Sequence, residues 1–251
     1  MFVNKICNYT NEWFSLFGNY SFFFLKSMQI YLLKIPTLDD FLDNLERMKV
    51  FIHESQHSIF DVKNKGQVAS ALAKVVVQYL AEKEFGQKAL LFSSTANGKP
   101  FIESLPDFCF NISHSKDFIA IAIDRKAVGI DVETLRDYKP LVAKRFFHEN
   151  EYCFLEYLSH EKQDVFFTQI WTLKESYVKF TGLGIANNFS NFSIILDSDE
   201  VKIEGKKHLS VYFKHYVLSD SVFVSVCATS SSFPSEVIEL SFPSLIIDGD
   251  F

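Results

Sequence analysis

A short acidic strand pattern occupies residues 129–133, which read Gly129-Ile130-Asp131-Val132-Glu133. In an extended strand alternate side chains point to the same face, so the carboxylates of Asp131 and Glu133 are expected to lie side by side. Two like charges held together inside a protein are costly unless a cation neutralises them. The pattern therefore predicts a strand with a cation-binding face or, as the alternative, an acidic face exposed to solvent and nearby lysines.

A second block lies downstream on a predicted helix and reads Trp171-Thr172-Leu173-Lys174-Glu175-Ser176-Tyr177-Val178-Lys179. Trp171, Glu175 and Lys179 are spaced four residues apart, which places them on one helix face. Alone, Glu175 and Lys179 would be an ordinary surface pair worth about 0.2–0.5 kcal/mol. Together with the two upstream acids they give three carboxylates and a lysine. Such a set suits a hard divalent cation that carries a phosphate ester.

Two further blocks offer donors for phosphate oxygens. The stretch Phe110-Asn111-Ile112-Ser113-His114-Ser115 is predicted to place Ser113 and His114 in a loop just after a strand, where hydroxyl and imidazole groups can donate. The turn Gly98-Lys99-Pro100 can direct the Lys99 ammonium at a phosphate, and the alternative is a solvated loop lysine. A serine hydrolase is rejected, because neighbours in a strand point apart and the sequence has no GxSxG motif.

Composition limits the class of protein. The chain has 251 residues, of which 48% are hydrophobic and 22% charged, as in ordinary folded proteins. A net charge of −6 argues against a general nucleic-acid binder, for which a basic excess is usual. The four cysteines form no CxxC pair, which favours a reducing, cytoplasmic setting over a disulfide or zinc framework.

The chain divides into an extension and two α+β halves. Residues 13–25 are apolar but interrupted by polar residues, and they are too short for a bilayer span of roughly 20 apolar residues, so no membrane attachment is expected. We expect residues 1–27 to be an extension outside the fold, 28–125 to form an N-terminal half and 126–251 a C-terminal half with the acidic site. Helices are predicted over residues 38–49, 66–84, 149–158 and 166–181, and strands over 28–33, 108–112, 118–123, 128–133, 192–196, 208–218 and 222–228.

In their order and spacing, these blocks resemble the motif set of the Sfp-type 4′-phosphopantetheinyl transferases. The stretch of residues 143–152, Ala-Lys-Arg-Phe-Phe-His-Glu-Asn-Glu-Tyr, is similar to that family too. The resemblance implies a pseudo-twofold monomer of two similar α+β halves, with coenzyme A and Mg²⁺ in the cleft between them. It also implies transfer of phosphopantetheine from coenzyme A to a serine of an apo acyl carrier protein or peptidyl carrier protein.

The resemblance also assigns roles to individual residues. It implies Asp131, Glu133 and Glu175 as magnesium ligands and Lys179 as a contact of the coenzyme A pyrophosphate. The remaining coenzyme A contacts that it implies are Lys99, Ser113, His114 and Lys65. Glu175 and Lys179 are the expected catalytic residues, with Glu175 acting as general base directly or through a magnesium-bound water. Glu151 matches a further acidic position near the site.

Some questions stay open at this level. Family members often carry an arginine-rich helix start that helps to bind the 3′-phosphate, whereas residues 61–67 offer only Lys63 and Lys65. The sequence does not choose between carriers of fatty-acid synthesis and those of antibiotic or other secondary-metabolite synthesis. Two rival functions are a non-catalytic module that binds coenzyme A or a carrier protein, and a magnesium phosphohydrolase. A Walker-type glycine loop, which would favour a nucleotide triphosphatase, is absent from the sequence.

Overall fold

The structure is a computed structural model that describes residues 27–182, 189–197, 201–205, 210–219 and 221–243. Helices and strands are mixed along the chain, which confirms the predicted α+β class. The expected extension over residues 1–27 lies outside the described residues except for its last position. In the described ranges, no helix combines the length and the hydropathy that a membrane crossing needs.

The N-terminal half begins and ends with strands of one sheet. Its elements are β1 (Gln29–Lys34), α1 (Leu38–Asp43), α2 (Leu45–Lys49), the 3-10 helix η2 (Glu54–Phe60), α3 (Lys65–Phe85), β2 (Phe92–Ser94), β3 (Pro100–Ile102), β4 (Cys109–Ser115) and β5 (Phe118–Asp124). The second half contains β6 (Val128–Thr134), α4 (Pro140–Phe146), α5 (Glu149–Glu156), α6 (His160–Thr181), η3 (Phe189–Asn191), β7 (Phe192–Leu196), β8 (Val201–Gly205), β9 (Tyr212–Ser219), β10 (Val222–Ala228) and β11 (Ile238–Leu240).

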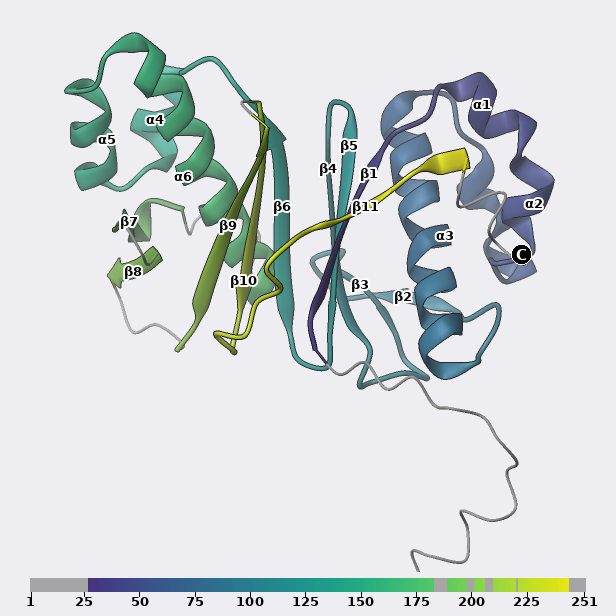
Figure 1. The fold of residues 1–251 in the computed structure, drawn as a ribbon. Coiled ribbons are helices and arrows are strands. Elements are labelled where there is room, and N and C mark those ends of the chain that lie inside the picture. The colour runs from purple at the N-terminus through teal and green to yellow at the C-terminus, as the bar shows by residue number, and fades with distance from the viewer. Residues whose placement is uncertain (1–26, 183–188, 198–200, 206–209, 220, 244–251) are drawn as a thin grey trace, which may run out of the picture.

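Two sheets pack between two groups of helices, as Figure 1 shows. The first sheet has the order β11-β1-β5-β4 and the second has the order β6-β10-β9. One apolar core lies between α1–α3 and the first sheet, and another lies between α4–α6 and the second sheet. A third core joins the sheets face to face. Both halves thus carry helices on the outer face of a sheet, while the pseudo-twofold relation between them stays a prediction.

Strand alternation explains why the acidic face of β6 points towards α6. Val128, Ile130 and Val132 are buried in the core between the two sheets. Side chains alternate along a strand, so Asp131 and Glu133 must point to the opposite face, on which α6 packs. The sequence prediction that these two acids share a face agrees with this arrangement.

Side chains, in addition to packing, connect the two sheets where β4 runs beside β6. The amide N–H of Ile130 donates to Asn111 Oδ1 over 2.8 Å. Ser113 Oγ donates to Asp131 Oδ1 over 2.7 Å, and Ser115 Oγ donates to Glu133 Oε2. The partners ascend together along both strands, so β4 and β6 run in the same direction. Residues of the first half therefore reach the acidic face of the second.

The last described strand returns to the first sheet. β11 pairs in parallel with β1, with Tyr31 opposite Ile238 and Leu33 opposite Leu240. Figure 1 shows β11 crossing from the second half to lie beside β1. A segment that belongs to the C-terminal half in sequence thus completes the N-terminal sheet. The division at residue 125 stays a prediction, and it places this strand with the other half.

Several sequence predictions of element bounds were wrong. The helix expected over residues 38–49 is two helices, because Asn44 ends α1 with non-helical backbone angles. Helix α6 begins at His160, six residues before the predicted start. Strand β4 extends to Ser115, so Ser113 and His114 lie in a strand and not in the predicted loop. Continued pairing with β5 keeps this segment extended.

A polar network beneath α6 makes the stability of the fold depend on pH. His215 Nδ1 lies 2.8 Å from Ser225 Oγ, which donates to Thr172 Oγ1 over 2.8 Å. The Nε2 atom of His215 is buried without a hydrogen-bond partner in the described structure. Burial lowers the pKa of His215 to about 4. The imidazole is therefore neutral in the folded protein at neutral pH.

We expect the free energy of unfolding to fall in acid because of His215. The unfolded pKa is roughly 6.5, so between that value and the folded pKa the unfolded chain binds the proton more readily. From pH 7.5 to pH 5 this group should remove about 2 kcal/mol of stability. Urea unfolding at both pH values should show a smaller difference for His215→Gln than for wild type. The exposed residue His160 supplies the control variant His160→Gln, and equal pH dependence in all three proteins would contradict the expectation.

Candidate active site

A glycine allows the backbone of β6 to lie directly against α6. A Cβ atom built on Gly129 would lie 2.1 Å from the carbonyl oxygen of Ser176 and 2.3 Å from the amide nitrogen of Phe180. Both are backbone atoms of the helix, so a side chain could not be accommodated by a rotamer change. Because the strand and the helix touch here, Asp131 lies two residues further along β6 beside the face of α6 that carries Glu175.

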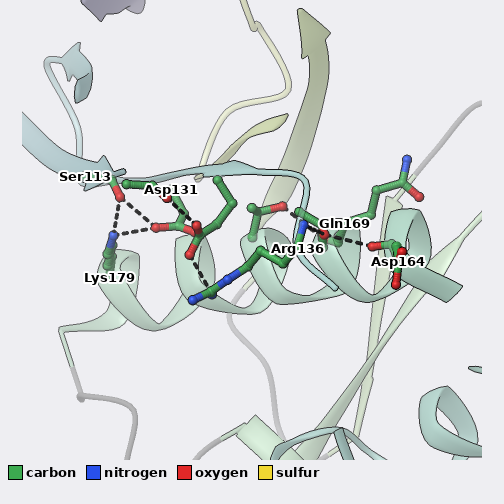
Figure 2. A network of polar contacts seen from close by, with 10 residues as sticks. Ser113, Asp131, Arg136, Asp164, Gln169 and Lys179 are labelled. Carbon is green, nitrogen blue, oxygen red and sulfur yellow. Dashed lines mark hydrogen bonds and ion pairs between the residues drawn. The ribbon is translucent and has the colours of Figure 1, made fainter. Parts of the chain in front are cut away.

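Asp131 is the centre of a three-residue network at this contact. Its Oδ1 atom accepts a hydrogen bond from Ser113 Oγ at 2.7 Å and forms an ion pair with Lys179 Nζ at 2.6 Å. Lys179 Nζ also donates to Ser113 Oγ over 2.7 Å. Figure 2 shows the three side chains converging from β4, β6 and α6. Asp131 is 4% exposed, and its other oxygen, Oδ2, is buried without a hydrogen-bond partner in the described residues.

Glu133 is held by an arginine and a serine. Arg136 donates to Glu133 Oε1 over 2.8 Å, and Ser115 Oγ donates to Oε2. The Arg136 guanidinium also lies over the ring of Trp171, 5.5 Å from its centroid. Burial raises the pKa of Glu133, the hydrogen bond from Ser115 lowers it, and the charge of Asp131 raises it. The guanidinium thus offsets part of the acidic charge at this end of the site.

Glu175 completes the acidic cluster from the helix. It is 7% exposed, and burial followed by the charge of Asp131 raises its pKa to about 7, against the opposing charge of Lys179. The charge of Glu133 acts in the same direction as that of Asp131. The three acids that sequence patterning selected therefore influence one another electrostatically, although they come from two elements 40 residues or more apart in the chain.

The donor atoms of this cluster suit a hard cation. Oxygen donors are the ligands that Mg²⁺ prefers, and the unpartnered Oδ2 atom of Asp131 is a buried acceptor beside them. Lys179 forms an ion pair with Asp131, and Arg136 forms one with Glu133. The carboxylates therefore stabilise positive charge at these two places. Among the residues that the structure describes, no three His, Cys, Asp or Glu side chains are arranged so that they could hold a metal ion. The predicted magnesium site thus stays a prediction, supported by the chemistry of the donors.

Lys99 lies next to this cluster but makes backbone contacts. Its Nζ atom donates to the carbonyl oxygen of Lys179 over 2.8 Å and to that of Val128 over 3.1 Å. Burial lowers the pKa of Lys99. The expected contact of Lys99 with a phosphate stays a prediction, and the structure gives the ammonium two other partners.

The remaining predicted contacts lie on the side of the first half. His114 is an exposed residue of β4 between the two serines that bond to β6. Partial desolvation and the charge of Lys179 lower its pKa, and the charge of Asp131 acts in the opposite direction. Lys65, at the start of α3, forms an ion pair with Asp117 in the β4–β5 turn. The structure does not bring Lys65 into hydrogen-bond contact with the acidic cluster.

Comparisons with known proteins identify the family. The family profile described as "4'-phosphopantetheinyl transferase superfamily" matches residues 127–227, which include β6 and α6. The 4′-phosphopantetheinyl transferase Sfp of Bacillus subtilis (strain 168) is 33% identical over 179 residues, 70% of this chain and 80% of that protein. The chain belongs to the 4′-phosphopantetheinyl transferase superfamily. This membership confirms the resemblance seen in the sequence motifs.

Two further matches extend the comparison. The 4′-phosphopantetheinyl transferase gsp of Aneurinibacillus migulanus is 29% identical over 234 residues, 89% of this chain and 97% of that protein. A crystal structure of a holo-(acyl-carrier-protein) synthase from Bacillus anthracis str. Ames, in complex with CoA (3′,5′-ADP), covers 42% of this chain and 96% of its own, with a TM-score of 0.36 and 21% identity. Since that structural overlap is small, the family assignment rests on the sequence relatives.

Sequence reasoning missed three residues that shape this candidate site. Gly129 provides the close strand–helix contact, and its place at the head of the acidic strand was an available signal. Ser115 bonds to Glu133, and the two-residue spacing from Ser113 repeats the spacing of the two acids. Arg136 bonds to Glu133 from three residues downstream, and one arginine after a strand carries no recognisable signal.

Glu151 has a structural partner in this phosphopantetheinyl transferase. It forms a fully buried ion pair with Lys174, at 2.9 Å, and caps the start of α5 through the amide of His148. Lys174 also donates to the carbonyl oxygens of Phe189 and Phe192. Glu151 therefore ties α5 and α6 to the segment that starts β7, and its contacts do not include the acidic cluster.

Proposed function

We propose that this chain transfers the 4′-phosphopantetheine moiety of coenzyme A to a serine of an apo carrier protein in a magnesium-dependent reaction. The products are the holo carrier protein and adenosine 3′,5′-bisphosphate. Family membership supports the transferase activity, and the observation that supports the metal dependence is the cluster of Asp131, Glu133 and Glu175 with an unpartnered Asp131 oxygen. This proposal assigns the three acids as the residues that would hold Mg²⁺.

The bond changes define what each residue must do. The serine Oγ of the carrier forms a bond to the β-phosphorus of coenzyme A, and the bond from that phosphorus to the bridging oxygen of the diphosphate breaks. The serine proton must leave, and Glu175 is the proposed acceptor because it is the buried carboxylate of the cluster whose pKa is raised to about 7. A bound magnesium ion would neutralise charge on the diphosphate and its leaving side.

The cationic side chains of the site have complementary roles. Lys179 lies at the end of α6 with its ammonium between Ser113 and Asp131, so it is the proposed contact of the diphosphate. Ser113 and His114 on β4 are the proposed contacts of the adenylate side of coenzyme A, with Lys65 as a further contact. These groups would hold the reacting phosphorus in line with the incoming serine, which is how positioning accelerates phosphoryl transfer.

The acceptor and the setting are part of the proposal. Acyl and peptidyl carrier proteins are the proposed protein substrates, and the relatives named above support this class. We propose that the chain acts as a monomer in the cytoplasm, since its cysteines and charge suit that setting. The rates of modification of carriers from fatty-acid synthesis and from secondary-metabolite synthesis, measured side by side, decide which class it serves.

A transfer assay tests this function and its metal dependence together. The assay uses coenzyme A that is labelled in the phosphopantetheine arm. We expect the label to be transferred to the acceptor serine of an apo carrier protein, and intact-protein mass spectrometry measures this transfer. EDTA in excess should lower the rate by about 100-fold or more, because the acidic cluster then lacks the charge it needs, and added Mg²⁺ should restore it.

The controls separate the alternatives. A carrier with its acceptor serine changed to alanine should stay unlabelled. Absence of transfer to several acyl and peptidyl carriers with Mg²⁺ present would refute the proposed function, and coenzyme A binding without transfer would favour a non-catalytic module. Release of adenosine 3′,5′-bisphosphate without any protein acceptor would instead indicate a phosphohydrolase.

A further inference from the structure

The turn between β2 and β3 makes two side-chain contacts with the end of α6. Lys99 Nζ donates to the carbonyl oxygen of Lys179, and Asn97 Nδ2 donates to that of Gly182 over 2.6 Å. Lys179 lies in the last turn of α6, and Gly182 is its C-cap with a left-handed φ of 69°. Carbonyl groups in the last turn of a helix lack intrahelical partners and carry partial negative charge. An ammonium and an amide from a distant turn therefore cap this helix end.

Lys99 also holds the helix against the acidic strand. One of its acceptors, the Val128 carbonyl, is the first residue of β6, directly before Gly129. The ammonium thus joins the backbones of β6 and α6 at the place where they touch. Two residues beyond Gly129 along β6, Asp131 meets the Lys179 side chain at 2.6 Å. A shift of the strand relative to the helix at Lys99 would change the Asp131–Lys179 distance.

We propose that Asn97 and Lys99 form a clamp on the C-terminal end of α6, and that Lys99 is a positioning residue that sets the spacing between Asp131 and the functional side chains of α6. This inference rests on the proposed transferase function for its kinetic consequences. It gives Lys99 a role different from the phosphate contact expected from the sequence. The clamp comes from the first half and grips the second, so it adds a connection between the two parts of the site.

The position of the ammonium favours clamping over phosphate binding. Lys99 is half-buried, and its Nζ atom is committed to two carbonyl oxygens at 2.8 and 3.1 Å. Its partner in the turn, Asn97, is uncharged and its contact is also with a backbone carbonyl of the same helix end.

Kinetics and ligand binding separate the two roles of Lys99. For Lys99→Met we expect kcat for carrier modification to fall by roughly 10–100-fold, because small misplacements of reacting groups are costly. The KM for coenzyme A and the Kd for adenosine 3′,5′-bisphosphate should each change by less than about 3-fold, since charge-assisted contacts to the ligand are not lost. A rise of about 10-fold or more in that Kd with kcat retained would overturn the proposal in favour of a phosphate ligand.

Hydrogen exchange tests the clamp without any turnover. Amide exchange over residues 178–182 should be about 10-fold faster in Lys99→Met and in Asn97→Ala than in wild type, because both variants lose caps of the last turn. Lys126→Met, at an exposed lysine of the β5–β6 turn, is the matched control and should exchange like wild type. Unchanged exchange in both turn variants would overturn the clamp.

The outcomes distinguish this inference from the proposed function. If wild type modifies no carrier, the transferase proposal fails, while the exchange measurement still decides the clamp. If Lys99→Met does not fold, Asn97→Ala carries the test, because Asn97 is exposed and its loss leaves the Lys99 ammonium in place. For that variant, a smaller loss of kcat with unchanged ligand Kd supports the clamp, and wild-type exchange together with wild-type kcat overturns it.

Discussion

Glu175→Gln is expected to abolish carrier modification while leaving the fold intact. The amide has the shape of the carboxyl group but cannot accept the serine proton, and it is a weaker ligand for a hard cation. A general base contributes roughly 10²–10⁴-fold, so kcat should fall by at least that range. Initial rates of labelled phosphopantetheine transfer, measured at saturating coenzyme A and carrier, provide the test.

Stability measurements show whether such a loss is catalytic. Glu175 is buried near two other carboxylates, so removing its charge relieves desolvation and repulsion. The variant should therefore unfold at a temperature no lower than wild type. The control is Glu161→Gln, at an exposed glutamate in the first turn of the same helix, which should keep full activity. A Glu175→Gln protein with wild-type kcat would remove Glu175 from the mechanism.

Gly129→Val is expected to cost about 4 kcal/mol or more of unfolding free energy and to inactivate whatever protein folds. Overpacking usually costs about 1–3 kcal/mol, but here the added atoms meet helix backbone at 2.1 and 2.3 Å and no side chain can move aside. The strand must separate from α6, which takes Asp131 away from Lys179. Gly129→Ala should show the same effects at smaller size. Urea unfolding monitored by far-UV circular dichroism gives the free energies.

A second glycine supplies the control for this experiment. Gly66 lies in the first turn of α3, where an added Cβ would meet only the side-chain oxygen of Asn64, at 3.4 Å. Alanine also favours a helix over glycine by up to about 1 kcal/mol, so Gly66→Ala should be neutral or slightly stabilising. If Gly129→Val unfolded at the same urea concentration as wild type, the close strand–helix contact would be refuted.

Periodicity in the sequence predicted much of the fold, because apolar spacing reflects which faces are buried. The helix over residues 66–84 and the strands over 118–123, 128–133 and 222–228 agree closely with α3, β5, β6 and β10. The break at Asn44 was not predicted, since helical spacing continues across it. The short strands β2, β3 and β11 were also missed, because three residues carry too little pattern to be recognised.

The acidic cluster was predictable for a different reason. Spacing of two in a strand and of four in a helix already restricts which side chains share a face, and the structure places Asp131 and Glu133 on the face of β6 against which α6 packs. Their joint role with Glu175 as metal ligands stays a prediction. Partners brought from other elements were not predictable in this way. The contact of Lys99 with a phosphate stays a prediction, whereas its contacts with two carbonyl oxygens were not predicted, because only the three-dimensional packing of the turn against α6 reveals those acceptors.

The parallel pairing of β11 with β1 has a consequence for how the chain is made. The ribosome synthesises β11 more than 200 residues after β1, so one edge of the first sheet stays uncovered until Ile238, the partner of Tyr31, has been made. During translation the backbone of β1 on that side has no ladder partner, and an open edge invites pairing with other chains. A chain from which residues 238–240 are missing therefore keeps this edge of β1 open to pairing with other strands.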